Sequence, residues 1–324
     1  MRSVAVRCLL FLLVGAPIHL AASAAFERAV FDDLNFRISE RQLDARVASG
    51  RAIRTLVLGD SHAYSGADPD VLGDAFNFAS SGENAAQTFG KLRWVLAAAP
   101  TVDVVVLPVD LHSFATFRAR RFDRPALWDR YVDWAEVGRT TGDPLSFLGL
   151  AASAHAPYVS GADDALLALT PGTGSATNRG SRLRDGFRPF DDSFADHPAA
   201  AQRAATRARN MLEGGDPFEP VSFEYFRRSL ELCADHGVRV ALVRYPVSEE
   251  YWREAVQKVD PEAFYARVQE TARRYAGTRL FDHHADYFGR NEKLRDPDHL
   301  NAKGAAEFSS ALRDEIAALR AAPR

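Results

Sequence analysis

The sequence predicts an α/β fold, a three-layer sandwich in which helices cover both faces of a central parallel sheet of about five strands. Five short apolar runs predict the strands, because a parallel strand buried on both faces shows as a continuous hydrophobic segment. Segments with helical spacing separate these runs, as expected when helices connect parallel strands. The chain has 324 residues, 47% of them hydrophobic, which is enough for one large domain with insertions.

The apolar runs place the expected strands at 55–58, 75–82, 102–107, 238–243 and 278–281. The first expected helix spans 85–98, where Phe89, Leu92, Val95 and Leu96 recur at helical spacing. Further helices are expected at 199–212, 223–233, 250–275 and 307–319. The 250–275 segment is expected to break near Asp260-Pro261, because proline interrupts a helix interior.

Residues 1–25 predict a signal peptide or an N-terminal membrane anchor. Arg2 and Arg7 precede a long apolar run, an order that favours export of the rest of the chain, and Ala22-Ser23-Ala24 fits a cleavage site. We therefore expect an exported protein, periplasmic or on the extracytoplasmic face of the inner membrane, with membrane contact through this segment. Residues 26–54 predict a helical lead-in beside the membrane, and 55–324 the main domain.

The stretch 114–220 is less regular than the segments around it. We predict that it is an insertion that caps the sheet and sets specificity. Within it, Arg118 opens a short basic run to Arg121, a pattern most typical of a solvated face. The polar segment from Thr170 to His197 predicts a long loop, and loops of that length are commonly functional.

Composition excludes some partners. The net charge of −3 and the isoelectric point near 6.3 argue against a nucleic-acid binder. The two cysteines, Cys8 and Cys233, do not resemble a disulfide pair, and no Cys/His spacing typical of zinc is present. We therefore expect neither a metal ion nor another cofactor.

Two polar clusters at opposite ends of the chain suggest nucleophilic catalysis. Gly59-Asp60-Ser61-His62 follows the first strand, and open α/β sheets bind ligands at the carboxyl ends of their strands. Near the other end, Asp296 and His299 are three residues apart, so the carboxylate can orient one imidazole nitrogen while the other faces outward. A serine hydroxyl needs such a base. The candidate triad is Ser61, His299 and Asp296.

Two further residues are candidates for substrate contacts, and a third is an alternative member of the triad. His62 directly follows the nucleophile, where it would shape the leaving-group side or simply be a polar turn residue. Arg244 ends the fourth strand, where it would pair with an anionic substrate group, with Asp110, or in a structural ion pair. Asp298 is an alternative to Asp296 as the orienting carboxylate.

The two clusters together resemble the conserved blocks of the SGNH/GDSL hydrolase superfamily. The first block is a strand followed by Gly-Asp-Ser, and the last is Asp-x-x-His, here Asp296-Pro-Asp-His299-Leu-Asn. The resemblance implies a flavodoxin-like sandwich and acyl-ester chemistry without a cofactor. It also implies that the Gly82 N–H, and the nearby Asn84 side chain, would bind the oxyanion.

One block departs from the superfamily pattern. Where its members usually show Gly-x-Asn-Asp, this chain has Pro108-Val109-Asp110, and an ionised Asp110 would repel an oxyanion. Divergent SGNH proteins of teichoic-acid D-alanylation and exopolysaccharide O-acetylation are similar in this respect. That similarity implies a serine esterase or O-acyltransferase, acting with acetyl groups on an exported or cell-envelope polysaccharide, with a membrane-bound O-acyltransferase as a partner.

Two alternatives stay open at this point. A metal-dependent phosphoesterase would use Asp60-x-His62, Asp110-x-His112 and the cluster His283, His284 and Asp286 as ligands. A catalytically degraded SGNH domain would bind a glycan or serve an acyltransferase as its partner, and the altered Asp110 block favours that reading.

Overall fold

The computed structural model describes residues 2–119, 122–160, 182–195, 199–212 and 216–323. Contacts divide the chain into two units. The first comprises Met1–Ile38 with Phe122–Ser181, and the second comprises Ser39–Arg121 with Arg182–Arg324. The second unit contains the sheet and every candidate site residue. The predicted domain boundaries, including an insertion at 114–220, stay predictions.

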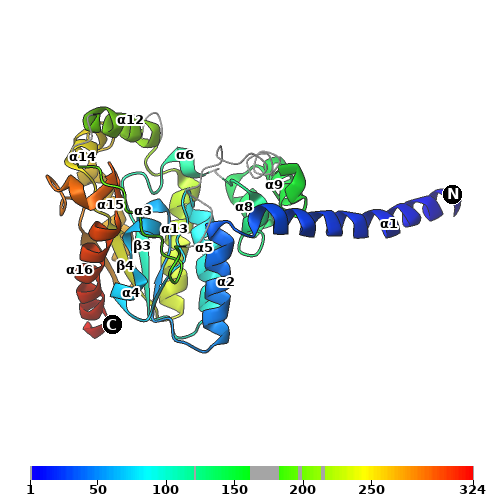
Figure 1. Ribbon diagram of the computed structural model, residues 1–324, viewed down its shortest axis with the longest axis horizontal. Coiled ribbons are helices and arrows are strands. Elements are labelled where there is room, and N and C mark those ends of the chain that lie inside the picture. Colours follow the sequence, from blue (N-terminus) through cyan, green and yellow to red (C-terminus); the bar gives the residue numbers. More distant parts are fainter. Residues whose placement is uncertain (1, 120–121, 161–181, 196–198, 213–215, 324) are drawn as a thin grey trace. The chain divides into compact units, whose positions relative to one another are not determined.

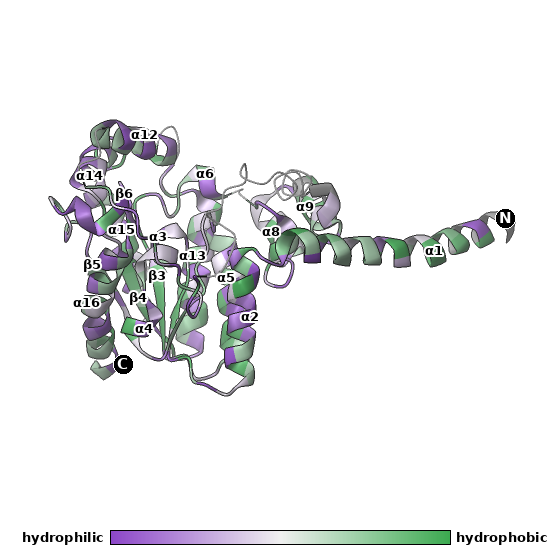
Figure 2. Cartoon of the chain, viewed as in Figure 1, coloured by the Kyte–Doolittle hydropathy of each residue, from purple (hydrophilic) through white to green (hydrophobic). Residues whose placement is uncertain are grey.

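The second unit is built on five parallel strands in the order β2-β1-β3-β4-β5 (Figure 1). This confirms the predicted α/β fold class. Nearly every residue of β1 to β4 is buried, and Figure 2 shows β3 and β4 as hydrophobic. The bounds are β1 Thr55–Val57, β2 Ala75–Asn77, β3 Val104–Pro108, β4 Arg239–Arg244 and β5 Thr278–Asp282.

Helices cover both faces of this sheet. The helix α5 (Ala85–Ala98) packs against α13 (Pro220–Asp235), while α16 (Ala302–Ala321) packs against α3 (Ser61–Gly66) and α4 (Pro69–Leu72). Figure 1 shows these two groups on opposite sides of the strands. The remaining helices of the unit are the C-terminal part of α2 (Asn35–Ala48), α6 (Thr116–Ala119), α12 (Ala200–Leu212), α14 (Glu249–Ala255) and α15 (Pro261–Ala272).

Side-chain caps explain most helix starts. Asn84 and Gln87 form a reciprocal capping box at α5, and Asp260 caps α15 just before its proline. The final helix was expected to begin at 307, but it begins at Ala302 because the Asn301 side chain accepts a hydrogen bond from the Gly304 N–H. The expected turn at Ser61 is instead the first turn of α3.

The segment carrying the second polar cluster is also more ordered than a turn. It forms a short antiparallel pair, β6 (Leu294–Asp296) and β7 (His299–Leu300), preceded by a 3₁₀ turn, η3 (Asn291–Lys293). The pair is tied to the rest of the unit, because the Ser248 N–H donates to the Pro297 carbonyl at 2.8 Å and the Phe194 N–H donates to the Leu294 carbonyl at 2.7 Å. Asp296 and His299 are therefore held on a rigid loop.

The described part of the first unit is helical. It contains α1 (Arg2–Phe26), a π-helical turn η1 (Glu27–Phe31), the first residues of α2, α7 (Pro125–Trp128), α8 (Trp134–Thr141), α9 (Pro144–His155) and α10 (Pro157–Ser160). Its aromatic core includes Phe36 against Trp128, with ring centroids 4.7 Å apart. Within the described residues, no helix combines the length and the apolar character needed to span a membrane. Much of the predicted loop 170–197 lies outside the described residues.

Candidate active site

The nucleophile candidate lies on a sharp turn at the carboxyl end of β1. Gly59 has φ +114, and a Cβ there would come within 2.4 Å of the Pro108 ring, so the turn requires glycine. Asp60 then caps α3 by accepting a hydrogen bond from the His62 N–H at 3.0 Å. Ser61 is thereby fixed as the first residue of α3.

The structure brings together the three residues of the predicted triad. The His299 Nε2 atom lies 2.8 Å from the Ser61 Oγ atom, and its Nδ1 atom lies 2.7 Å from Asp296 Oδ1. In the tautomer that Asp296 favours, Nδ1–H donates to the carboxylate and Nε2 accepts from the serine hydroxyl. Serine, base and orienting carboxylate thus stand in the order that activates a hydroxyl.

A second carboxylate supports the same imidazole. Asp298 Oδ1 lies 3.3 Å from His299 Nδ1, an ion-pair distance, whereas the bond from Asp296 is shorter. Burial opposes the charge on His299, but Asp296 and Asp298 outweigh it and raise the pKa of the imidazole. The geometry therefore favours Asp296 as the orienting residue, with Asp298 as a nearby fixed charge.

The carboxylate of Asp298 is fully buried and has several polar partners. The Arg207 Nε atom lies 2.8 and 3.0 Å from its two oxygens, and His62 Nε2 lies 3.2 Å from Oδ2. Burial raises the pKa of this carboxyl, but His299 and Arg207 hold it well below its usual value. Asp298 is thus an ionised carboxylate that contacts two histidines and one arginine.

His62 is a buried residue that faces two carboxylates, and its effect on the leaving-group side stays a prediction. Its side chain is 1% exposed, with Nδ1 2.9 Å from Asp110 Oδ2 and Nε2 facing Asp298. The ring lies edge-on to His299, with centroids 5.0 Å apart. Burial lowers the pKa of His62, but Asp110 and Asp298 outweigh burial and raise it to about 10. His62 is therefore an imidazolium at neutral pH.

Asp110 does not present an uncompensated charge to an oxyanion. It is 7% exposed, its Oδ1 accepts a hydrogen bond from the Tyr245 N–H at 2.9 Å, and its Oδ2 faces the His62 imidazolium. The repulsion expected from the Pro108-Val109-Asp110 block is thus offset by His62.

Three partners were predicted for Arg244, and the structure shows one of them, a structural ion pair. Arg244 lies 2.5 Å from Asp282 and stacks over the Tyr265 ring at 3.7 Å, with no ion pair to Asp110 among the described residues.

Sequence reasoning missed two residues that hold the serine turn. Arg118 was expected on a solvated face, but its side chain is 3% exposed and lies 3.1 Å from Asp60. His112 Nε2 lies 2.9 Å from the same carboxylate, and burial lowers the pKa of His112 to about 4, so the ring is neutral. No sequence signal separates these side chains from ordinary polar loop residues, because only tertiary packing brings them to Asp60.

Two backbone N–H groups are available for an oxyanion. Within the described part of the chain, neither the Ser61 N–H nor the Gly82 N–H has a hydrogen-bond acceptor. Gly82 lies in a turn with φ +79, and the Ser80 N–H ties that turn to the Gly59 carbonyl at 2.9 Å. The Asn84 Oδ1 atom is occupied in capping α5, which fixes the side chain beside this turn.

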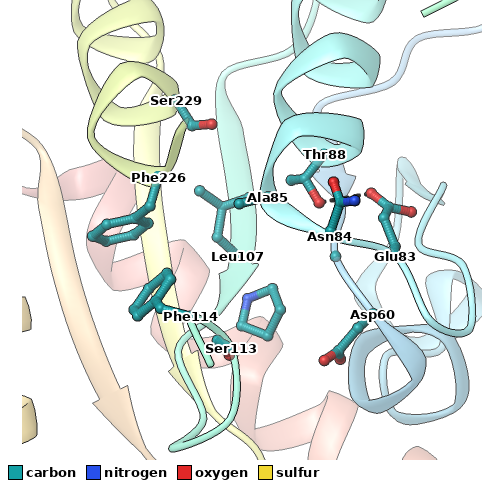
Figure 3. Close-up of a pocket in the computed structure, with 12 residues that line it drawn as sticks. Asp60, Glu83, Asn84, Ala85, Thr88, Leu107, Ser113, Phe114, Phe226 and Ser229 are labelled. Atoms are coloured by element: carbon teal, nitrogen blue, oxygen red, sulfur yellow. Dashed lines mark hydrogen bonds between the residues drawn. The ribbon is translucent and has the colours of Figure 1, made fainter. Parts of the chain in front are cut away.

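A small cavity of about 40 Å³ adjoins Gly59 and Asp60. Figure 3 shows its two kinds of wall: Phe114 and Phe226 lie together on one side, and Asp60, Glu83, Asn84 and Thr88 lie on the other. A water-sized probe needs roughly 10 to 15 Å³, so the cavity has room only for a small group.

The ligands proposed for a two-metal site do not form one cluster. His283 contacts Asp286 at 2.7 Å and Glu315 at 2.9 Å, and His284 contacts Asp282. Over the described ranges, the group whose ligand atoms lie within reach of one ion is His62, Asp298 and His299, which coincides with the hydrogen-bonded network above.

Comparison with known proteins adds little to this geometry. No protein-family model and no curated protein matches the chain. A solved structure from Streptococcus pneumonia, provisionally described as a platelet activating factor, aligns with a TM-score of 0.43 and 13% identity, covering 92% of this chain and 99% of that one. This likeness carries no argument about activity, which is inferred from the site itself.

The two carboxylates near His299 are expected to respond differently to substitution. Asp296→Asn favours the wrong imidazole tautomer, so kcat/KM for an ester substrate should fall at least about 100-fold while the fold is kept. Asp298→Asn leaves Arg207 and His62 facing a neutral group, so it should lower the free energy of unfolding by about 3 kcal/mol. Urea unfolding and ester kinetics on both variants test this, and a larger stability loss for Asp296→Asn would contradict it.

His62 is expected to make stability depend on pH. Its pKa in the folded protein, about 10, lies above the ordinary value of 6.5. Its contribution is therefore complete below pH 6.5 and is lost as pH rises towards 10. The difference in unfolding free energy between the wild type and His62→Gln should shrink over that range. A difference that stays constant from pH 6 to pH 10 would contradict a charged His62, and ¹⁵N chemical shifts of the ring would report the imidazolium directly.

Proposed function

We propose that this protein is a serine acyl-ester hydrolase or O-acyltransferase that handles acetyl esters of a polysaccharide. The observation that carries the proposal is the continuous contact from Ser61 Oγ through His299 to Asp296, at 2.8 and 2.7 Å. A neutral serine hydroxyl is a weak nucleophile. An imidazole that accepts its proton, and a carboxylate that orients the imidazole, make the hydroxyl reactive.

In the first half-reaction, the Ser61 Oγ atom attacks the ester carbonyl while His299 Nε2 takes the hydroxyl proton. The tetrahedral intermediate collapses, His299 returns a proton to the departing alcohol, and an acyl-serine is left. In the second half-reaction, His299 deprotonates water or a sugar hydroxyl, which attacks the acyl-serine carbonyl. The bond between the acyl carbon and Ser61 Oγ then breaks, His299 returns the proton to Oγ, and the acid or the acylated sugar leaves. Asp296 holds the imidazole and stabilises its charged form throughout.

The oxyanion would be bound by the N–H groups of Ser61 and Gly82. Removing one such donor typically costs about 3 kcal/mol in the barrier. Asn84 caps α5 beside the same turn, and its role at the oxyanion stays a prediction. The imidazolium of His62 supports this arrangement, because it balances Asp110 where the SGNH superfamily usually places an asparagine.

The acceptor decides between the two reactions. Water gives an esterase, and a sugar hydroxyl gives a transferase. The resemblance to SGNH proteins of polysaccharide O-acetylation supports the transferase and a membrane-bound O-acyltransferase as partner. Export and membrane contact are proposed on the N-terminal sequence pattern.

The first test is hydrolysis of p-nitrophenyl acetate by the full chain, alongside Ser61→Ala and His299→Ala. We expect activity that survives a metal chelator and falls at least about 1,000-fold in both variants. The profile of kcat/KM should rise with an apparent pKa above 6.5, because the carboxylates raise the pKa of His299. Activity that is lost with chelator and kept in Ser61→Ala would instead support a metal-dependent enzyme. Glycan binding without ester turnover would support a non-catalytic domain.

We further propose that the cavity beside Gly59 and Asp60 holds the acyl group, which predicts a preference for short acyl groups. With room for about 40 Å³, it should accept an acetyl group and crowd a butyryl group. One methylene is worth roughly 10- to 200-fold in such pockets, so kcat/KM should fall at least about tenfold from p-nitrophenyl acetate to p-nitrophenyl butyrate. Equal rates for acetate, butyrate and octanoate would show that this cavity does not hold the acyl chain.

A further inference from the structure

A second, larger hollow lies beside the triad carboxylate. Its volume is about 350 Å³, within the lower range of small-ligand sites. One wall is the loop Asp296-Pro297-Asp298, and the other is a face of α12 carrying Gln202, Arg203, Thr206, Arg207 and Asn210. We call this hollow the α12 groove.

The helix α12 presents that face for a physical reason. Its apolar residues Ala204, Ala208, Met211 and Leu212 recur at helical spacing and are buried, and the helix packs against α14 (Figure 1). The opposite face is consequently polar, as the colouring of α12 in Figure 2 shows. Packing against α14 fixes which side chains line the groove.

Arg207 links the groove to the catalytic network. Its Nε atom is held by Asp298 at 2.8 and 3.0 Å, and its side chain is 36% exposed. Over the described residues, its two Nη atoms have no protein hydrogen bond. The guanidinium is thus pinned by a buried carboxylate and offers pre-oriented donors to a ligand.

Three neighbouring side chains supply further donors and acceptors. Gln202, Thr206 and Asn210 stand at successive turns of α12 and line the groove, and none of them hydrogen-bonds another described residue. Two amides and a hydroxyl can each both donate and accept. That combination matches a ligand rich in hydroxyl groups, which also donate and accept.

The charges of the lining favour a neutral ligand. Arg203 and Arg207 contribute two positive charges, and Asp296 and Asp298 contribute two negative charges. A polyanion would meet the partly exposed Asp296 carboxylate, and the Arg207 guanidinium is already paired with the buried Asp298. Recognition in the α12 groove must therefore depend mainly on hydrogen bonds.

We propose that the α12 groove is a subsite for an uncharged saccharide segment next to the hydroxyl that carries, or accepts, the acyl group. This proposal rests on the proposed function for its place in the reaction, because the groove borders the Asp296 side of the triad. In this proposal, the polar face of α12 selects the polymer.

The test measures binding to Ser61→Ala protein, which separates recognition from turnover. The neutral probes are cellotetraose, maltotetraose and tetra-N-acetylchitotetraose, and the anionic probe is tetragalacturonate. Calorimetry should show binding of at least one neutral probe that changes less than twofold between 50 and 500 mM salt. Hydrogen exchange should slow in residues 199–212 on binding. Absence of binding by all three neutral probes, or protection elsewhere only, would overturn the proposal.

Variants of the groove sharpen the test. Thr206→Ala/Asn210→Ala, in the Ser61→Ala background, should weaken the neutral probe at least tenfold. Arg209→Gln is the matched control, because it lies on the same helix outside the groove lining, and it should change affinity less than twofold. Circular dichroism and urea unfolding check that the variants fold. Equal affinities for the double variant and the control, or tighter binding of tetragalacturonate than of every neutral probe, would overturn the proposal.

The two proposals fail in different ways. Ester hydrolysis by the wild type that does not depend on Ser61 would overturn the serine mechanism and leave saccharide binding to α12 intact. Serine-dependent hydrolysis with no saccharide protection of α12 would overturn the groove and leave the esterase intact.

Discussion

The site depends on the contacts that the buried carboxylate of Asp298 makes with positively charged side chains. This carboxylate contacts His299, His62 and Arg207, which come from β7, α3 and α12. An ionised carboxylate is stable in such a place only when positive partners replace the water it has lost. Because those partners come from three separate elements, the charge can be satisfied only when β7, α3 and α12 are assembled around it.

This dependence explains why the site tolerates an aspartate after β3. Asp110 faces one nitrogen of His62 while Asp298 faces the other, and Arg207 supplies a second positive charge beside Asp298. The neighbouring Asp60 is balanced separately by Arg118 and accepts a hydrogen bond from the neutral His112. In the proposed acyl transfer, His299 gains positive charge with two carboxylates already beside its Nδ1 atom. The arrangement stabilises the charged base without exposing an unpaired anion to the oxyanion.

The proposed recognition of a ligand in the α12 groove depends on the same ion-pair network. Arg207 both neutralises Asp298 and lines the groove, so a ligand bound there contacts a group that touches the catalytic network. In the proposed subsite, one guanidinium would contact both Asp298 and the bound segment, which would place that segment at a fixed distance from His299. Such fixed placement is what converts binding energy into rate.

The sequence by itself determined the five strands, the α/β class and the pairing of Ser61 with Asp296 and His299. Continuous apolar runs report burial directly, and the turn at Gly59 and the Asp-x-x-His spacing are local. Only the tertiary structure decided the roles of His62, Asp110, Arg118 and Arg207. Their side chains meet partners far away along the chain: His62 and Asp298, for example, are 236 residues apart. A charged side chain carries no mark in the sequence of whether water or a distant opposite charge will surround it, because the folded sheet and its helices create that environment.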